Sequence, residues 1–385
     1  MGSLLLKLAL PLILCGMSVA IATSSTPSNP GGCLCTSGSV PIPVDIRIPV
    51  DPANGLNTTN LRRLKNTFNI FGQLCQPSNT GRTLLETDHV QLLLHGSTYT
   101  HQYWTFPMNG FQNYSYAAYA CSQGQATFAY DQLGVGLSDR PSNSTDVQLP
   151  VVAQIASSLA KKLKDGTISS TLGFPNQRFK KVVAISHSQG SIVNNYATIH
   201  STDKGFSGAE SFDALILTGH IHDPGFLQSA NNPRPLARDV NPSLWGTLDS
   251  GYVTTPNRSS FYPPTNIQTI GFSQQVFTLD TLTLDVSSRW ITFDIASVYV
   301  PAKGYKGPVV ELVGEFDQLH CLNSLEDDGG GPCNAATLQA TEKIFWPDSR
   351  NFTMMVREGS GHDVNLDFGA SGTFSLLSEL ARSLV

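Results

Sequence analysis

The sequence predicts an α/β fold: a mostly parallel eight-stranded sheet with helices on both faces. Three observations predict it. Short apolar runs recur along the chain, amphipathic helical stretches occur between and after them, and this alternation is interrupted by only one long segment. Continuous apolar runs are typical of strands buried on both faces, as in a parallel sheet. We therefore expect an α/β core, formed by residues 41–220 and 308–385, with one insertion.

The first residues predict a processing segment that is separate from this core. Lys7 gives a positive flank, an apolar run follows, and Ala20-Ile21-Ala22 matches a small-x-small cleavage pattern. Together they indicate a secretory signal peptide over residues 1–22. A membrane anchor is the alternative, but the run is shorter than the roughly 20 residues that span a bilayer. Residues 23–40, rich in Ser, Thr, Pro and Gly, predict a flexible lead-in.

The strand candidates of the core are apolar, β-rich runs bounded by turn residues. In order they are residues 44–48, 68–74, 90–94, 126–130, 181–185, 214–217, 309–313 and 352–356. Between the fourth and fifth runs, apolar residues from Leu149 to Leu163 recur at three- and four-residue steps, which predicts an amphipathic helix. A second helix is expected over residues 371–384. The carboxyl ends of parallel strands meet at one edge, where ligands usually bind.

The long interruption is residues 221–307, between the sixth and seventh strand candidates. Connections in compact domains are far shorter, and longer ones are often functional. The segment carries many aromatic side chains, which could roof an apolar pocket, although many of them will form the core of the segment itself. We interpret this insertion as a cap or lid.

Composition places the chain among soluble globular proteins. It has 385 residues, 14% of them charged, with a net charge of -5, so no nucleic-acid partner is expected. The oligomeric state stays open. Secretion would make five N-x-Ser/Thr sites candidates for glycosylation. These are Asn57, Asn113, Asn143, Asn257 and Asn351.

Removal of the signal peptide would leave an even number of cysteines, which in a secreted protein suggests disulfides. They are Cys33, Cys35, Cys75, Cys121, Cys321 and Cys333. Their pairing stays open, with Cys321 and Cys333 as the favoured local pair. A zinc site is the weaker alternative, because the C-x-C of Cys33 and Cys35 has no matching second knuckle. We expect no metal.

The clearest sign of chemistry is the segment Ser186-His187-Ser188-Gln189-Gly190. It joins an apolar strand candidate to a helix-like stretch, which predicts a strand, a tight turn and a helix. Small neighbours at Ser186 and Gly190 let the chain reverse there and lift Ser188 off the carboxyl edge of the sheet. We interpret Ser188 as a nucleophile, with a helix-capping serine as the alternative. The usual pattern has glycine at the position of Ser186.

A serine hydroxyl is a weak nucleophile at neutral pH, so it needs a histidine base and a carboxylate that orients the base. Asp317 follows the seventh strand candidate, and His362 lies in the small-residue loop after the eighth. Both positions are at the expected carboxyl edge. Glu315 and Asp223 stay open as alternative acids.

Two other histidines near these motifs are interpreted as structural. His187 directly precedes the nucleophile and is expected to pack beneath the turn. His320 comes too early in the chain for the base and is expected to pack in its loop.

Acyl transfer also needs donors for the oxyanion that develops on the substrate carbonyl. One candidate is the backbone N-H of Gln189, directly after the nucleophile. The other is the backbone N-H of Ser97, because His95-Gly96-Ser97 directly follows the third strand candidate.

These motifs resemble the α/β-hydrolase superfamily, in its branch of secreted fungal serine hydrolases. The resemblance spans residues 90–363 and includes the glycine-rich loop Asp131 to Arg140, the serine turn and Gly361-His362. It implies the α/β-hydrolase fold with a cap between strands six and seven, a structural role for Asp131 and Arg140, and an acyl-enzyme cycle without a cofactor. Ser186 departs from the family pattern and puts the local approach of strand and helix in question.

We therefore expect a secreted carboxylic ester hydrolase that acts on an apolar or aromatic small molecule. A histidine base with an ordinary pKa near 6.5 predicts that activity falls below about that pH. An aminopeptidase or amidase, or a lyase or cyclase of secondary metabolites, could use the same triad. A non-catalytic binding module is a further alternative. The serine argues against haloalkane dehalogenase or epoxide hydrolase activity, which use aspartate at that position.

Overall fold

The computed structural model describes residues 33–78, 86–106, 110–175, 177–200, 211–223, 226, 234–322 and 331–385. The predicted signal peptide, 1–22, and the first part of the predicted lead-in lie outside the described residues. None of the described helices combines the length and apolar character needed to cross a bilayer.

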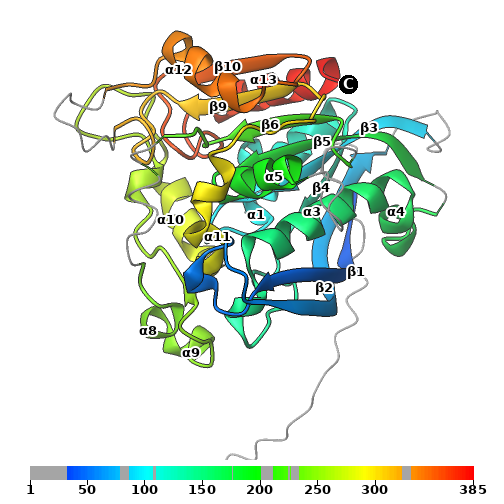
Figure 1. The fold of residues 1–385 in the computed structure, drawn as a ribbon. Coiled ribbons are helices and arrows are strands. Elements are labelled where there is room, and N and C mark those ends of the chain that lie inside the picture. Colours follow the sequence, from blue (N-terminus) through cyan, green and yellow to red (C-terminus); the bar gives the residue numbers. More distant parts are fainter. Residues whose placement is uncertain are drawn as a thin grey trace, which may run out of the picture.

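One eight-stranded sheet forms the centre of the molecule, in the order β1-β2-β4-β3-β5-β6-β9-β10 (Figure 1). The strands are β1 (Cys33–Pro49), β2 (Leu61–Pro77), β3 (Glu86–Leu94), β4 (Ala126–Tyr130), β5 (Arg178–His187), β6 (Ala214–Thr218), β9 (Val309–Gly314) and β10 (Phe352–Arg357). β2 pairs antiparallel with β1 and β4, and all other neighbours are parallel. The eight predicted strands and the predicted fold class are confirmed.

The beginning of the sheet corrects the prediction for the lead-in. β1 begins at Cys33, so residues 33–40 form a strand instead of a flexible segment. Their backbone pairs with β2 from Cys33 opposite Pro77 to Val40 opposite Ile70. Disulfides Cys33–Cys121 and Cys35–Cys75 fix this polar stretch. Disulfides and backbone hydrogen bonds to β2 therefore stabilise a strand over residues 33–40, although the sequence there lacks the apolar pattern of a strand.

Helices cover both faces of the sheet, as predicted. They are α1 (Gln102–Thr105), α2 (Tyr116–Ser122), α3 (Leu149–Lys164), α4 (Thr167–Thr171), α5 (Gln189–Ile199), α12 (Ala335–Glu342) and α13 (Ala370–Ser383). Leu92 and Leu94 of β3 belong to the core that includes Leu159 of α3 and Ile192 of α5. Leu93 points the other way, into the core that includes Phe374 of α13. Alternate residues of one strand thus fill two cores.

The insertion between β6 and β9 contains short elements on the left of Figure 1. They are α8 (Ala237–Val240), α9 (Pro242–Trp245), α10 (Gln274–Leu282), α11 (Arg289–Phe293), and the strands β7 (Tyr252–Val253) and β8 (Ser287–Ser288), which pair with one another. Trp245 and Tyr252 belong to a small separate core of this segment. As expected, some of its aromatic residues are structural.

Single-turn 3-10 helices complete the described structure. They are η1 (Pro52–Asn54), η2 (Gln112–Tyr114), η3 (Ser144–Asp146), η4 (Ser259–Phe261), η5 (Ile295–Val298) and η6 (Lys343–Phe345).

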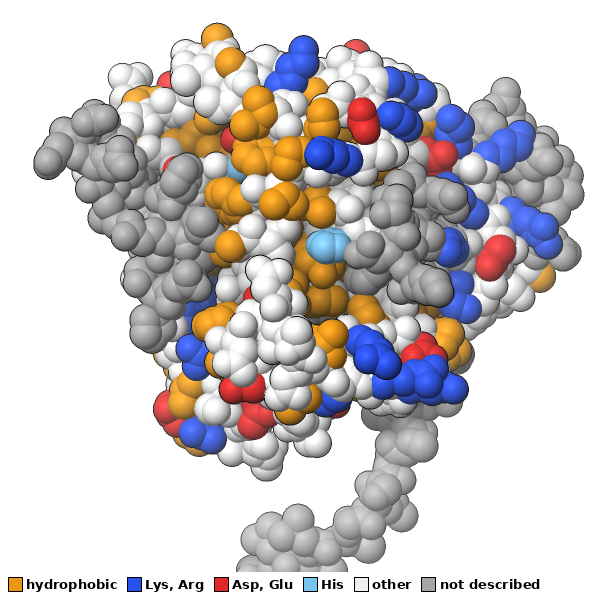
Figure 2. Space-filling model, viewed as in Figure 1, with side chains coloured by type: hydrophobic (Ala, Val, Ile, Leu, Met, Phe, Trp, Pro, Cys, Tyr) orange, Lys and Arg blue, Asp and Glu red, His pale blue; other side chains and the backbone are white. Residues whose placement is uncertain are grey.

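The favoured local disulfide, Cys321–Cys333, is present. The five predicted glycosylation sites are all exposed, and their glycosylation stays a prediction. In Figure 2, hydrophobic side chains are grouped in the middle of the visible face, and charged side chains of both signs lie around them.

Candidate active site

Ser188 lies at the turn between β5 and α5 in a conformation that is rare for a residue with a side chain. Its φ is 52° and its ψ is -120°. Among the described residues other than glycine, Thr98 alone shares a positive φ, of 63°, and it follows β3 at the same site. Such backbone conformations persist where the surrounding structure imposes them, and they cluster at functional sites. The predicted strand, turn and helix at Ser188 are therefore present.

The residues around Ser188 must be small because the chain segments approach closely. A side chain at Gly190 would place its Cβ 2.6 Å from the His95 carbonyl oxygen and 2.8 Å from Leu94 Cγ. Ser186, at the position where glycine is usual, is fully buried within β5. The turn thus forms with serine there, and the departure at Ser186 does not prevent the approach of strand and helix.

His362 and Asp317 come from the loops after β10 and β9 and meet at the carboxyl edge of the sheet. His362 Nδ1 lies 2.7 Å from Asp317 Oδ2, and both side chains are buried. The other carboxylate oxygen of Asp317 accepts hydrogen bonds from the backbone N-H of Leu319 at 2.8 Å and of His320 at 3.2 Å. His362 Nε2 is buried and has no hydrogen-bond partner among the described residues.

The two alternative acids have other partners. Glu315 accepts a hydrogen bond from the backbone N-H of Gly359 at 2.8 Å, and Asp223 accepts one from that of Phe226 at 2.7 Å. Of the three candidate acids, Asp317, Glu315 and Asp223, Asp317 is the one that forms a hydrogen bond with His362.

The electrostatics of this pair favour a charged imidazolium next to a carboxylate. Burial alone would raise the pKa of Asp317, but the positive charge and hydrogen bond of His362 hold it well below its usual range. Burial alone would lower the pKa of His362, but the Asp317 carboxylate raises it above 6.5. His362 can therefore take up a proton at Nε2 near neutral pH.

Of the two predicted oxyanion donors, Ser97 lies in the loop after β3, and Gln189 directly follows Ser188. No described backbone carbonyl accepts a hydrogen bond from either N-H. His95 holds the loop after β3 that carries Ser97. Its Nδ1 contacts the Gly96 oxygen at 2.8 Å, and its Nε2 accepts a hydrogen bond from the backbone N-H of Gln132 at 3.1 Å. Burial lowers the pKa of His95 to about 4, so its ring stays neutral and both contacts persist at neutral pH.

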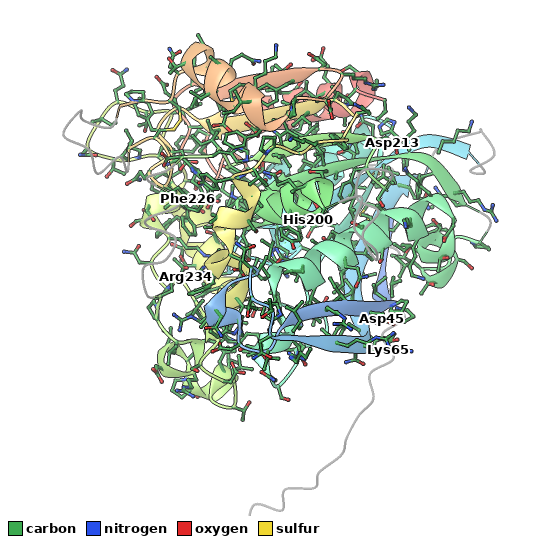
Figure 3. The ribbon with its side chains drawn as sticks, viewed as in Figure 1. Asp45, Lys65, His200, Asp213, Phe226 and Arg234 are labelled. Atoms are coloured by element: carbon green, nitrogen blue, oxygen red, sulfur yellow. A yellow bond between two sulfur atoms is a disulfide. The ribbon has the colours of Figure 1, made fainter. Side chains whose placement is uncertain are left out.

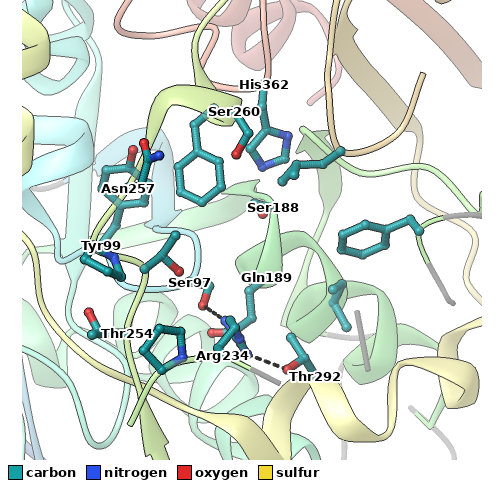
Figure 4. Close-up of a pocket in the computed structure, with 17 residues that line it drawn as sticks. Ser97, Tyr99, Ser188, Gln189, Arg234, Thr254, Asn257, Ser260, Thr292 and His362 are labelled. Atoms are coloured by element: carbon teal, nitrogen blue, oxygen red, sulfur yellow. Dashed lines mark hydrogen bonds between the residues drawn. The ribbon is translucent and has the colours of Figure 1, made fainter. Parts of the chain in front are cut away.

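Ser188, His362, Ser97 and Gln189 line one pocket of about 450 Å³ (Figure 4). The core contributes apolar side chains such as Ile192 to its wall. The insertion contributes both apolar and polar side chains, among them Arg234, Pro235, Thr254, Pro256, Phe261 and Thr292. None of the described lining residues is Asp or Glu. The candidate site is therefore a mostly apolar pocket that the core and the insertion build together.

The insertion also holds the candidate oxyanion residues by their side chains. Ser287 Oγ lies 2.9 Å from Gln189 Oε1, and Arg234 Nη1 donates to Ser97 Oγ at 2.6 Å. The insertion also contacts the glycine-rich loop after β4, because its Asp285 accepts hydrogen bonds from the Gly136 N-H and from Arg140, both at 2.9 Å.

The glycine-rich loop after β4 is held as the resemblance implied. Asp131 accepts the backbone N-H groups of His101 at 2.7 Å and Leu137 at 2.9 Å, and Arg140 donates to the Gly134 oxygen at 2.9 Å. Asp131 and Arg140 therefore have structural contacts.

A second histidine-carboxylate pair lies beneath the first, and it was not predicted. His187 Nε2 is 3.0 Å from Asp363 Oδ1, and its Nδ1 is 3.0 Å from Thr218 Oγ1. Tyr103 stacks on the ring at 4.4 Å, and Tyr99 donates to Asp363. His187 is fully buried, in agreement with the packing role expected for it. The signal that could have found the pair is its position, directly before Ser188 and directly after His362.

Two buried groups bring potential metal ligands together: Asp317, His320 and His362, and His222, Glu311 and Glu342. Hydrogen bonds within the protein engage both. In the second group His222 Nδ1 lies 2.5 Å from Glu342, and Trp346 donates to Glu311 at 2.8 Å. Burial, followed by the neighbouring Glu342 carboxyl, raises the pKa of Glu311 well above its usual range.

Several solved structures are similar to this chain. A soluble variant of monoglyceride lipase from Saccharomyces cerevisiae is 14% identical with a TM-score of 0.49, and the match covers 83% of this chain and 92% of that one. An esterase from Exiguobacterium antarcticum is 15% identical with a TM-score of 0.48, covering 82% and 96%. An epoxide hydrolase from Vigna radiata is 14% identical with a TM-score of 0.45, covering 82% and 95%. No curated protein matches the sequence significantly.

The family assignment comes from the sequence match. The model of the alpha/beta hydrolase family matches residues 91–370, from β3 to the first residue of α13. The match covers most of the chain and includes Ser188, Asp317 and His362, so the chain belongs to the alpha/beta hydrolase family.

Proposed function

We propose that the protein is a secreted serine hydrolase that cleaves a carboxylic ester. Ser188 is the nucleophile, His362 the general base and acid, and Asp317 the carboxylate that orients His362. The backbone N-H groups of Ser97 and Gln189 bind the oxyanion. This assignment follows the chemistry of a serine, histidine and carboxylate arranged around one pocket.

The proposed reaction proceeds in two halves. His362 Nε2 takes the proton of Ser188 Oγ as that oxygen attacks the ester carbonyl carbon, and the carbonyl oxygen becomes the oxyanion. The C-O bond to the alcohol then breaks, and the alcohol leaves with the proton from His362. Water repeats these steps on the acyl-serine, which releases the carboxylic acid and restores Ser188.

The observation that carries the proposal is the hydrogen bond between His362 Nδ1 and Asp317, at 2.7 Å. The other ring nitrogen of His362, Nε2, has no hydrogen-bond partner among the described residues, and His362 lines the same pocket as Ser188. The apolar side chains of that pocket favour an apolar or aromatic substrate. The rival aminopeptidase would need a carboxylate to bind the amine of its substrate, and the described lining residues include none.

The test is labelling of the folded, secreted protein with a fluorophosphonate probe, followed by peptide mapping. We expect the adduct on Ser188, and none on the Ser188→Ala variant. Ser191→Ala is the matched control, because Ser191 lies on α5 and donates to the Thr218 oxygen at 3.0 Å, away from the pocket lining. An adduct that maps to a different residue, or folded protein that stays unlabelled, would contradict the proposal.

A further inference from the structure

We propose that the substrate of this site carries a carboxylate, which Arg234 binds inside the pocket. The inference rests on the proposed ester hydrolysis for the site of reaction, and it adds the substrate class. Arg234 belongs to the insertion and lies on the side of the molecule where α10 and α11 are found (Figure 3). It lines the pocket together with Ser188 and His362. In Figure 4, Ser188 lies between His362 and Arg234.

The guanidinium is fixed by two hydroxyl groups and not by an acid. Nη1 donates to Ser97 Oγ at 2.6 Å, and Nη2 donates to Thr292 Oγ1 at 2.7 Å. Among the described residues, no carboxylate forms an ion pair with Arg234, and the charged neighbour that acts on it is Arg289, also a cation. Burial, followed by Arg289, lowers the pKa of Arg234 to about 10, so the side chain is still positive at neutral pH.

A second arginine of the insertion shows how a buried cation is usually accommodated. Arg258 Nη1 lies 2.5 Å from Asp280 Oδ1, and its guanidinium stacks on Tyr99 at 3.9 Å. Buried charges are normally paired in this way, because leaving one unpaired in a poorly solvated site is costly. Arg234, which is half-buried, has no such carboxylate partner among the described residues, although it lies in the same segment and on the wall of the candidate active site.

The pocket has further donors that fit an anion. A guanidinium has five N-H groups in a fork that matches a carboxylate, and hydrogen bonds to hydroxyls engage two of those of Arg234. Gln189 is 3% exposed and lines the pocket, and its Nε2 has no hydrogen-bond partner among the described residues. The apolar wall suits the carbon chain between the carboxylate and the ester. The substrate class is therefore an ester with a free carboxylate.

The carboxylate could belong to the acyl part or to the alcohol part of the ester, and two matched substrate pairs separate these sources. The first compares mono-para-nitrophenyl glutarate with its neutral methyl ester. The second compares the butyryl esters of para-hydroxybenzoate and of para-hydroxybenzamide. In one of the two pairs, we expect the charged substrate to have a kcat/KM roughly 10- to 150-fold higher at neutral pH than its neutral counterpart. This factor corresponds to the free energy of a hydrogen bond to a charged group.

Variants test which residue causes the preference for the charged substrate. Arg234→Met should abolish it, Arg234→Lys should retain part of it, and Arg289→Met should leave it intact, because Arg289 does not line the pocket. Equal kcat/KM values within both pairs would overturn the inference while leaving the proposed ester hydrolysis in place. A preference that survives in a folded Arg234→Met protein would overturn it as well.

A binding measurement tests the inference without turnover. Calorimetry on the folded Ser188→Ala protein compares glutarate with the neutral glutaramide, and we expect glutarate to bind at least about tenfold more tightly. Equal binding of the two compounds would overturn the assignment of Arg234. Absence of fluorophosphonate labelling and of all ester turnover would instead contradict the proposed function, and this comparison would still decide the role of Arg234.

Discussion

Two buried histidine-carboxylate pairs lie at the candidate site, one through His362 and the other through its sequence neighbour Asp363, and their environments differ. His362 contacts Asp317 at 2.7 Å, whereas His187 contacts Asp363 at 3.0 Å. The Asp317 carboxylate raises the pKa of His362 in spite of burial. For His187 burial is the largest influence, and it lowers the pKa although Asp363 opposes it.

Access to the pocket separates the two pairs as well. His362 lines the pocket and its Nε2 has no partner among the described residues. Both ring nitrogens of His187 have hydrogen-bond partners, and Tyr103 stacks on its ring. A histidine next to a carboxylate is therefore not sufficient for a base, because a free nitrogen toward the substrate is also needed. We expect the first pair to act in the reaction and the second to position it.

The largest expected difference between the pairs comes from replacing the two histidines. His362→Gln should lower kcat on the order of 10⁴- to 10⁶-fold, since no base would remain for Ser188. His187→Gln should keep kcat within roughly tenfold and lower the free energy of unfolding by about 1–3 kcal/mol, through its lost hydrogen bonds. Steady-state kinetics and denaturant unfolding measure both effects. Similar losses of kcat in the two folded variants would remove the distinction.

The two carboxylates should differ in the same direction. Asp317→Asn should reduce kcat about 10³- to 10⁴-fold, because the amide no longer stabilises the charged imidazolium or fixes its tautomer. Asp363→Asn should act mainly on stability, lowering the free energy of unfolding by about 1–3 kcal/mol. A larger loss of kcat in Asp363→Asn than in Asp317→Asn would reverse the proposed roles.

The pH dependence of kcat/KM should follow the first pair. Because His362 must be neutral to accept a proton and its folded-state pKa is raised, activity should fall as the pH drops through a value above 6.5. His187→Gln should leave this acidic limb in place, since the pKa of His187 is lowered and its ring is already neutral in that range. If His187→Gln shifted the pH at which kcat/KM falls on the acidic side, this would argue that the second pair controls the pKa of His362.

The smallest expected effect is at Thr218, which holds the second pair from β6. Its Oγ1 lies 3.0 Å from His187 Nδ1 and donates to the Ser186 oxygen at 3.0 Å. Thr218→Val should lower the free energy of unfolding by about 1 kcal/mol and change kcat little. Thermal melting with parallel turnover assays would show this, and a large loss of kcat without a loss of stability would contradict it.

The features that could be predicted from the sequence are those encoded by local patterns. The strands and the serine turn are contiguous in sequence, and Asp317 and His362 follow strands whose carboxyl ends share one edge. Polar contacts between distant segments could not be predicted, because they depend on how parts of the chain that are far apart in sequence pack against one another. Arg234 reaches Ser97 across 137 residues of sequence, and His187 reaches Asp363 across 176.

The beginning of β1 shows the same limit within the core. The polar composition of residues 33–40 favours a loop, and only pairing with β2 and the disulfides to Cys75 and Cys121 make that segment a strand. Partners far away in sequence decide the structure there.

The central claim is that His362 is the base and His187 a neutral supporting residue. Nuclear magnetic resonance of protein with isotope-labelled histidine tests it most directly, with the two signals assigned through His362→Gln and His187→Gln. We predict that His362 titrates above pH 6.5 and that His187 stays neutral at that pH. Titration of His187 above pH 6.5, with His362 neutral throughout, would contradict the account.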